Sequence, residues 1–333
     1  MKFPYYTGNP KNRQTRGPAE LPVSRRAGLE NPAGYLPDRG LIDAVNVALL
    51  LGQPLLLTGE AGTGKTQLAY SVAWELGFGE PLKFETKSTS TARELFYAFD
   101  TLGRFHAAQT NEGSQNSLDY ITYNALGLAI LYAREEKEVA PWLPKEFQHD
   151  GQRRSVVLID EVDKAPRDFP NDILNEVEEM YFKVPELGNA KIAANPSLRP
   201  ILIITSNSEK HLPDAFLRRC IYYNIPFPER QRLSQIVAAR LGSFVAQSSE
   251  LLADALEVFY KFREPESGLR KKPATAELLG WLLVLSEIGK EGENPLRQKK
   301  ELIPSTITTL VKTADDQPQA QTVLAEWLRN KSA

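Results

Sequence analysis

Eight consecutive residues, GEAGTGKT (59–66), combine three glycines with a lysine and a threonine at the spacing G-x-x-x-x-G-K-[ST]. The glycines let the backbone fold around a phosphate group, so that its N–H groups point inward. The Lys65 ammonium group can then bind the β- and γ-phosphates, and the Thr66 hydroxyl can ligate Mg²⁺. The residues expected to surround the phosphates are Gly59, Glu60, Ala61, Gly62, Thr63, Gly64, Lys65 and Thr66.

This loop lies between two segments that predict regular structure. The residues before it, QPLLLTG (53–59), form a short apolar run typical of a strand buried on both faces. The residues after it, KTQLAYSVAWELG (65–77), have helical spacing and end at a glycine. A strand, a glycine-rich turn and a helix in this order are the context that supports a phosphate loop, and the helix start adds the positive end of its dipole.

A second buried strand is predicted to bring two acids to the same place. The run VVLIDE (156–161) is apolar up to Asp160 and Glu161. Ligands of doubly wound sheets bind at the carboxyl ends of the strands, so both acids are expected beside the phosphate loop. Asp160 can hold Mg²⁺ through water, and Glu161 can accept a proton from an attacking water. Without the loop, two acids at this position would indicate only an exposed strand end.

Two further segments offer groups for the phosphates. The apolar strand PILIITSN (200–207) ends in Asn207, whose amide can orient a water and contact a γ-phosphate, although Asn is also a common turn residue. In DAFLRRC (214–220), Arg218 and Arg219 stand between two apolar runs, with only Asp214 acidic nearby. Two permanently charged guanidinium groups there indicate an anionic partner, either a phosphate or an acid at an interface.

A basic cluster precedes a predicted helix in GLRKKPATAELLGWL (268–282), with Thr275 as the expected N-cap. A cation from this cluster can reach a phosphate, or it can simply be solvated. The three histidines and the single cysteine, Cys220, have no metal-ligand spacing, and no nucleophile motif surrounds the thiol.

The order of the predicted elements favours a two-part fold. Apolar strands alternate with helices up to Pro228, whereas only helical spacing follows it, in 229–244, 250–263, 275–289 and about 319–330. This pattern predicts the α/β class: a three-layer αβα domain with a parallel sheet, followed by a small all-helical lid. Residues 181–195 predict a hairpin turning at Gly188-Asn189, and 90–110 and 117–135 predict helices. The expected parts are an extended arm at 1–34, the αβ domain at 35–228 and the lid at 229–333.

Composition excludes several classes of protein. The formal net charge of −2 argues against a general nucleic-acid binder, which is usually basic. One cysteine permits no internal disulfide, which fits a reducing compartment. The first residues lack the apolar core of a signal peptide, and no apolar run reaches the ~18 residues that span a bilayer. We therefore expect a soluble, cytoplasmic protein.

Taken in order, these motifs resemble those of the AAA+ ATPases, which have a P-loop NTPase fold. Two segments, YLPDRGLIDAVNVALLLGQPLLLTGEAGTGKT (35–66) and TSNSEKHLPDAFLRRC (205–220), resemble the MoxR-like branch, and the hairpin before the third strand is similar to one found in a large AAA+ branch. The resemblance covers about residues 30–285.

The resemblance implies a role for each candidate residue. It implies ATP at Gly59–Thr66, Mg²⁺ at Thr66 and Asp160, Glu161 as catalytic base and Asn207 as first sensor. The adenine would lie near Tyr35, Leu36 and Pro37. MoxR-like lids usually place an arginine after Ser-Pro, whereas here the order is Lys271-Lys272-Pro273-Ala274-Thr275. The second sensor is therefore Lys272 or, next, Arg270.

The resemblance also suggests the function. It implies an ATP-hydrolysing, chaperone-like remodeller that works as a ring, most often a hexamer, with a von Willebrand factor A domain protein or another protein as its partner. One of Arg218 and Arg219, with Arg218 preferred, would then serve the γ-phosphate of the next subunit as an arginine finger, and the hairpin would face the ring axis and contact the client. The alternatives are a nucleotide-switched scaffold in a regulatory or defence system with little turnover, and a nucleic-acid-directed motor. A GTPase is disfavoured because no N-K-x-D segment is present.

Overall fold

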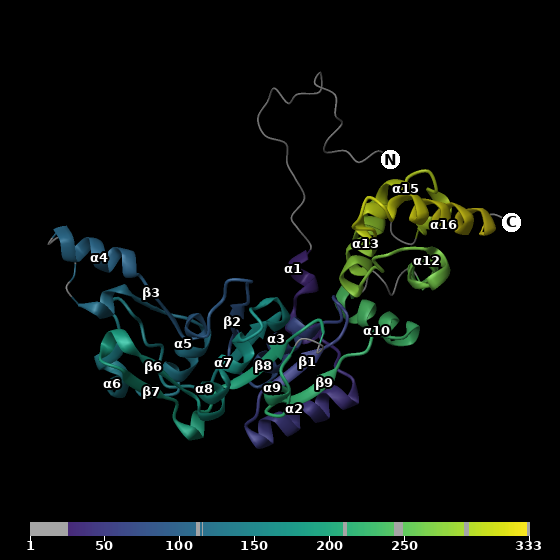
Figure 1. The fold of residues 1–333 in the computed structure, drawn as a ribbon. Helices are drawn as coiled ribbons and strands as arrows, with labels where there is room; N and C mark the ends of the chain where they lie inside the picture. The colour runs from purple at the N-terminus through teal and green to yellow at the C-terminus, as the bar shows by residue number, and fades with distance from the viewer. Residues whose placement is uncertain are drawn as a thin grey trace, which may run out of the picture. The chain divides into compact units, whose positions relative to one another are not determined.

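The computed structural model describes residues 26–110, 114, 116–208, 212–242, 249–289 and 293–331. The chain divides into two compact units, which we call the αβ unit (37–227) and the helical unit (up to 36, together with 228–333). Figure 1 shows their elements along the chain. None of the helices in the described ranges combines the length and the apolar character required to cross a bilayer.

The αβ unit is built on a parallel sheet of five strands in the order β2-β5-β8-β1-β9. The inner strands β1 and β5 are buried at every residue, which explains why their sequences are continuous apolar runs rather than alternating ones. The register places Glu85 opposite Asp160 and Thr58 opposite Asn224, so the polar strand ends meet at one edge. The strands are β1 (Leu55–Thr58), β2 (Leu82–Glu85), β5 (Val156–Asp160), β8 (Ile201–Thr205) and β9 (Ile221–Asn224).

Helices pack on this sheet, and the first of them has a defined cap at each end. The first, α2, starts after Asp38, whose carboxylate accepts a hydrogen bond from the Leu41 N–H at 2.8 Å, and ends at Gly52 with φ of 62°. It contacts β9, α3 contacts β5 and β8, and α5 contacts β2 and β5. The helices are α2 (Arg39–Leu51), α3 (Lys65–Glu75), α4 (Thr101–Thr110), α5 (Ala125–Tyr132), α6 (Glu136–Val139), α7 (Phe169–Asp172), α8 (Leu174–Glu179) and α9 (Asp214–Leu217).

Two antiparallel pairs of strands, the second of which is a hairpin, lie side by side at the end of the unit that carries α4 and α6 (Figure 1). They are β3 (Tyr97–Phe99) with β4 (Ile121–Tyr123), and β6 (Tyr181–Val184) with β7 (Ala190–Ala193). Phe182 joins them, because its ring lies 5.4 Å from that of Phe96 and 6.0 Å from that of Tyr123. The predicted hairpin at 181–195 is confirmed.

The helices predicted at 90–110 and 117–135 are wrong over part of their length, because β3 and β4 interrupt them. Residues 97–99 and 121–123 place Tyr97 and Tyr123 in the buried aromatic cluster around Phe182, and this packing overrides the local helical spacing. The loop of the β6–β7 hairpin is hydrogen-bonded to Tyr97 of β3. Gly188 and Asn189 are exposed, but Glu186 accepts hydrogen bonds from Tyr97 at 2.8 Å and from Arg93 at 3.2 Å.

The helical unit has its own core, in which Trp281 and Trp327 are almost fully buried and the Trp281 indole donates a hydrogen bond to Thr306 at 2.8 Å. Thr275 is the first residue of α13, so its predicted place as N-cap is wrong. Ala274 holds that position, and the Glu277 side chain accepts a hydrogen bond from its N–H at 3.0 Å. The longer helices are α10 (Arg230–Leu241), α12 (Ser249–Arg263), α13 (Thr275–Ile288) and α16 (Gln317–Asn330), and the short ones include α14 (Pro295–Gln298) and α15 (Ile303–Thr306).

The predicted α/β class, a parallel sheet flanked by helices with a helical part after it, is confirmed. Of the expected N-terminal arm, residues 1–25 lie outside the described residues. The rest of it contains a short helix, α1 (Arg26–Leu29), and a 3₁₀ turn at Pro32–Gly34, and the Asn31 carbonyl accepts a hydrogen bond from Arg240. The domain boundaries at 34/35 and 228/229 stay predictions.

Candidate functional site

The loop between β1 and α3 has the backbone geometry that its glycines permit. Gly59, Gly62 and Gly64 all have positive φ, at 137°, 76° and 91°. A β-carbon at Gly59 would lie 2.5 Å from the Ile225 carbonyl oxygen, so no larger residue fits there without a backbone shift. The helix α3 then begins at Lys65, directly after the left-handed Gly64. The glycine-rich segment is therefore a tight strand-to-helix turn, as a phosphate loop requires.

The Lys65 ammonium group lies at the centre of this loop. It donates hydrogen bonds to the carbonyls of Gly59 at 2.8 Å and Glu60 at 3.0 Å, and to Asn207 Oδ1 at 3.0 Å. Its side chain is largely buried, and this burial lowers the pKa of Lys65 in spite of the nearby carboxylates, Asp163 foremost. Lys65 and Asn207, each predicted from the sequence to contact the phosphates, are thus brought together.

Asp160 ends β5 next to the start of α3. Its Oδ1 accepts hydrogen bonds from the hydroxyls of Thr66 at 2.9 Å and Thr205 at 2.7 Å, and its Oδ2 lies 3.0 Å from the Lys83 ammonium group. Burial raises the pKa of Asp160, but the hydrogen bonds from Thr205, Lys83 and Thr66 together bring it below its usual range. Asp160 is therefore an anion near neutral pH. Neither Thr205 nor Lys83 was predicted: in the segment 200–207 only Asn207 was singled out, and Lys83 lies in no recognised motif.

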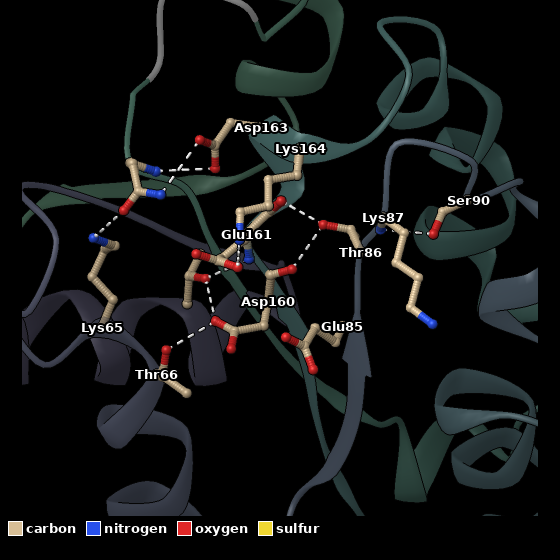
Figure 2. A network of polar contacts seen from close by, with 12 residues as sticks. Lys65, Thr66, Glu85, Thr86, Lys87, Ser90, Asp160, Glu161, Asp163 and Lys164 are labelled. Carbon is tan, nitrogen blue, oxygen red and sulfur yellow. Dashed lines mark hydrogen bonds and ion pairs between the residues drawn. The ribbon is translucent and has the colours of Figure 1, made fainter. Parts of the chain in front are cut away.

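Glu161 follows Asp160 in an unusual backbone conformation. Its φ of 57° is in the left-handed region, where residues other than glycine are uncommon. The conformation is held from both sides, because its N–H donates to Thr205 Oγ1 at 2.9 Å and its carbonyl accepts from the Thr86 hydroxyl. Its carboxylate forms an ion pair with Lys164 (Figure 2). The position of this acid is thus fixed by its neighbours rather than by a regular strand.

Asn207 is oriented by an acid that the motifs did not single out. Asp163 Oδ1 accepts a hydrogen bond from the Asn207 backbone N–H at 3.1 Å, and its Oδ2 lies 3.5 Å from the Asn207 side-chain nitrogen. The side-chain oxygen of Asn207 is left facing Lys65. A signal was present in the sequence: Asp163 follows the Asp-Glu pair by two positions, in a turn that continues from β5.

The two arginines after α9 differ in their surroundings. Arg219 Nε lies 2.9 Å from the Glu178 carboxylate of α8, and its Nη1 donates to the Ala215 carbonyl at 3.1 Å. The acid that forms an ion pair with Arg219 is therefore Glu178, and not Asp214, which is nearer in sequence. Arg218 is exposed and forms no hydrogen bond or ion pair through its side chain with any described residue. Of the two, Arg218 is the cation that remains available to another molecule.

The other predicted contacts lie in the helical unit. The Leu36 carbonyl accepts a hydrogen bond from Arg232 at 2.8 Å. Arg270 pairs with Asp315 at 2.9 Å, whereas Lys272 is exposed and its side chain has no such partner in the described part of the chain. This difference favours Lys272 over Arg270 as a free cation. The expected parts of Leu36 and Lys272 in nucleotide binding stay predictions.

The side chains present fit a magnesium ion. Mg²⁺ prefers oxygen ligands and in nucleotide sites takes only one or two from the protein, the rest being phosphate and water. The Thr66 hydroxyl and the ionised Asp160 carboxylate, 2.9 Å apart at the start of α3, are such a pair. No group of three or more His, Cys, Asp or Glu side chains suited to a metal ion occurs within the described residues. A magnesium ion here would thus depend on the nucleotide.

The comparisons with known proteins agree with this geometry. The model of the family described as "ATPase family associated with various cellular activities (AAA)" matches residues 55–228, slightly more than half of the chain. The matched range runs from the first residue of β1 to just beyond β9 and includes the loop, both acids, Asn207 and both arginines. No curated protein matches the chain.

Proposed function

Because this chain belongs to the ATPase family associated with various cellular activities (AAA), and so is an ATP-binding protein, we propose that it hydrolyses ATP in a ring of identical subunits. The observation that carries the proposal is the convergence of Lys65, Thr66, Asp160 and Asn207, from the ends of two strands, β5 and β8, and the start of one helix, α3, around the phosphate loop. Such a constellation serves phosphoryl transfer by positioning and by charge stabilisation.

In the proposed mechanism, the backbone N–H groups of 59–66 and the Lys65 ammonium group bind the β- and γ-phosphates. Magnesium, held by Thr66 and Asp160, would neutralise part of the phosphate charge. Glu161 accepts the proton of the attacking water, and Asn207 orients that water with its amide. Burial of Asp160 and Lys65 strengthens each of these interactions, because charges attract more strongly where water is excluded.

Arg218 completes the site of the next subunit in the proposed ring. It is permanently charged, exposed and unpaired within the described residues, whereas Arg219 is engaged by Glu178. A guanidinium group supplied in trans meets charge that develops on the γ-phosphate only in the transition state. We therefore assign the finger to Arg218 and a positioning part to Arg219. Leu36 and Lys272 of the helical unit are proposed to contact the adenine and the phosphates, respectively.

The biological role that we propose is MoxR-like: remodelling of a partner protein, with a von Willebrand factor A domain protein as the expected partner, a hexamer as the expected ring, and the cytoplasm as the expected location. The hairpin β6–β7 supports a protein client, since it stands outside the main sheet and exposes Gly188 and Asn189 at its tip. A nucleic-acid client is disfavoured by the net charge of −2.

One observation favours a second candidate, a nucleotide-switched scaffold with little turnover. The Glu161 carboxylate is paired with Lys164, and a base engaged in this way is less available to take a proton. The two candidates differ in phosphate release. The remodeller releases phosphate, and its rate rises when the partner is added. The scaffold binds ATP but releases negligible phosphate with or without the partner.

The test of ATP binding is a calorimetric titration of the wild-type protein and of the Lys65→Ala and Lys87→Ala variants. Lys65→Ala should abolish binding, because it removes the cation facing the phosphates. Lys87→Ala, the control, removes an exposed lysine without a side-chain partner in the described residues, so ATP affinity should be unchanged. Near-normal affinity of Lys65→Ala would overturn the assignment of the site.

A further inference from the structure

A lysine from the edge of the sheet lies against the acid that is proposed to hold magnesium. Lys83 is on the edge strand β2, in register with Leu158 of β5. Its ammonium nitrogen is 3.0 Å from Asp160 Oδ2 and 3.9 Å from Glu85 Oε2. The Asp160 side chain is only 8 % exposed, so this ion pair is shielded from water on the side of the acid.

Both oxygens of the Asp160 carboxylate are engaged. Oδ1 accepts the hydroxyls of Thr66 and Thr205, and Oδ2 faces Lys83. The hydroxyl donors can rotate or accept a second partner at little cost, whereas the ammonium group carries a full positive charge. A divalent cation drawn to Asp160 therefore meets a positive charge already placed on one of its two oxygens.

We propose that Lys83 competes with magnesium for Asp160 and thereby sets the magnesium concentration at which this chain binds nucleotide tightly. The proposal rests on the function proposed above. Lys83 acts through Asp160 and is a positioning residue, because its contacts are with carboxylates rather than with the reacting atoms. Thr66 and Asp160 remain the magnesium-binding pair.

Glu85 allows Lys83 to leave Asp160, so that Lys83 competes with magnesium for this acid and does not exclude magnesium from it. Its carboxylate is the second acid within 4 Å of the Lys83 ammonium group, at the end of the same strand, and it is exposed. The flexible lysine side chain can turn from Asp160 to Glu85 without losing an anionic partner, which lowers the cost of leaving Asp160. The register of β2 with β5, which sets Glu85 opposite Asp160, keeps both acids within reach of one lysine.

The experiment measures binding of a fluorescent ADP analogue, in EDTA and across a magnesium titration, for wild type, Lys83→Met, Lys83→Arg and Lys87→Met. Replacing Lys83 by methionine keeps most of the side-chain volume and removes the charge. We expect the half-saturating magnesium concentration to fall on the order of tenfold, since a positive charge next to the site is lost. Lys83→Arg keeps the charge and should stay near wild type.

Lys87→Met is the matched control. Lys87 follows the same strand, is exposed and is directed away from Asp160 (Figure 2). Its loss should leave the magnesium dependence unchanged, which separates a local contact from a change of net charge. Affinity in EDTA should be equal in all four proteins, because Lys83 and Lys87 do not contact the phosphate loop, and it also reports that each variant is folded.

Glu85→Gln should change the magnesium requirement in the opposite direction to Lys83→Met. It removes the alternative partner of Lys83, so the half-saturating magnesium concentration should rise, and it should rise less when Lys83 is already methionine. An unchanged or higher magnesium requirement in Lys83→Met would overturn the proposal, as would loss of nucleotide binding in EDTA in that variant alone. Absence of nucleotide binding by wild type would instead overturn the proposed function.

Discussion

Asn207 Oδ1 accepts a hydrogen bond from the Lys65 ammonium group at 3.0 Å, although the two residues are 142 positions apart in the sequence. The end of β8 is thereby connected directly to the phosphate loop. Asp163 holds the Asn207 backbone from the other side at 3.1 Å. In the proposed site, a γ-phosphate bound by Lys65 would come within reach of Asn207, as the proposed role of first sensor requires.

Glu161→Gln should retain ATP and stop turnover. The amide preserves the shape of the side chain but cannot take a proton, so phosphate release should fall ~10²–10⁴-fold while ATP affinity stays near wild type. Release is measured with a coupled phosphate assay and affinity by calorimetry. The control is Glu179→Gln, an exposed acid on α8 that forms an ion pair with Lys191 of β7 and not with a residue of the loop. Loss of a general base predicts a much larger fall in rate. A Glu161→Gln protein that retains more than about a third of the wild-type rate would therefore contradict the role of Glu161 as base.

Arg218→Ala and Arg219→Ala should differ. Arg218→Ala should lose ~10³–10⁵-fold in the rate of ATP hydrolysis, because a transition-state contact in trans is removed. Arg219→Ala loses an exposed ion pair with Glu178, and such pairs contribute about 0–1 kcal/mol, so its rate should fall by no more than about fivefold. Steady-state rates of the two variants decide the assignment, and the reverse order would make Arg219 the finger.

A mixing experiment tests whether the finger acts in trans. Arg218→Ala protein and Lys65→Ala protein should each be inactive alone. Mixed rings contain some interfaces with an intact phosphate loop facing an intact arginine, so part of the activity should return. If mixed rings are shown to form and no activity returns, the assignment in trans is wrong.

Glu186→Ala should destabilise the packing of the hairpin β6–β7. It leaves the Tyr97 hydroxyl without its acceptor, and Tyr97 is 1 % exposed, so the free energy of unfolding should fall by about 1–3 kcal/mol. Denaturant unfolding measures the loss. Glu179→Ala, at the end of α8, removes an exposed ion pair with Lys191 of β7 and should change the free energy of unfolding by less than about 0.5 kcal/mol. If the hairpin contacts the client, partner-stimulated hydrolysis should fall while basal hydrolysis stays near wild type.

Asp254→Ala should destabilise the helical unit. The Asp254 side chain is 2 % exposed and accepts hydrogen bonds from Arg297 at 2.6 Å and from Asn294 at 2.8 Å. Its removal leaves the buried Asn294 amide without its acceptor, whereas Arg297 is exposed and keeps Glu250 as a partner, so the free energy of unfolding should fall by about 1–3 kcal/mol. Urea unfolding followed by the fluorescence of the buried Trp281 measures it. Asp315→Ala, which breaks an exposed pair, should cost less than about 1 kcal/mol.

Asp254 should also make the free energy of unfolding depend on pH. Burial raises the pKa of Asp254, but the hydrogen bonds from Arg297 and Asn294 bring it below its usual value. A carboxyl group with a lowered pKa in the folded protein stabilises it above the pKa of the unfolded chain, about 3.9, and this contribution is lost as the pH falls through the folded pKa. Unfolding free energies of wild type and Asp254→Asn should therefore converge below about pH 4 and differ at pH 7.

The elements that carry the site were predictable because each depends on local sequence. The phosphate loop needs glycines where φ is positive, and the buried strands β1, β5 and β8 appear as unbroken apolar runs. Parallel pairing then places the polar residue after each run at the same edge. Lys65, Thr66, Asp160 and Asn207 could therefore be grouped before their distances were known, and the structure adds the distances.

The contacts that were missed depend on side chains meeting across the sheet. Lys83 stands on an edge strand with alternating burial, so nothing local indicates that it reaches Asp160. Asp163 contacts Asn207 only because β5 and β8 are neighbours. Strands β3 and β4 were predicted as helix because their residues have helical spacing, and only packing on Phe182 makes them extended.

The position of β1 in the sheet has a consequence for synthesis of the chain. Its neighbours are β8 and β9, and the Thr58 hydroxyl accepts a hydrogen bond from Asn224, 166 residues later. Ribosomes add ~5–20 residues per second, so β1 waits on the order of ten to thirty seconds before its partners are made. During that interval an apolar strand with two open edges is exposed, which makes the nascent chain vulnerable to aggregation and a candidate for early chaperone binding. The candidate nucleotide site is thus among the last parts of the αβ unit to assemble, and truncated chains ending before residue 201 should be unable to form it.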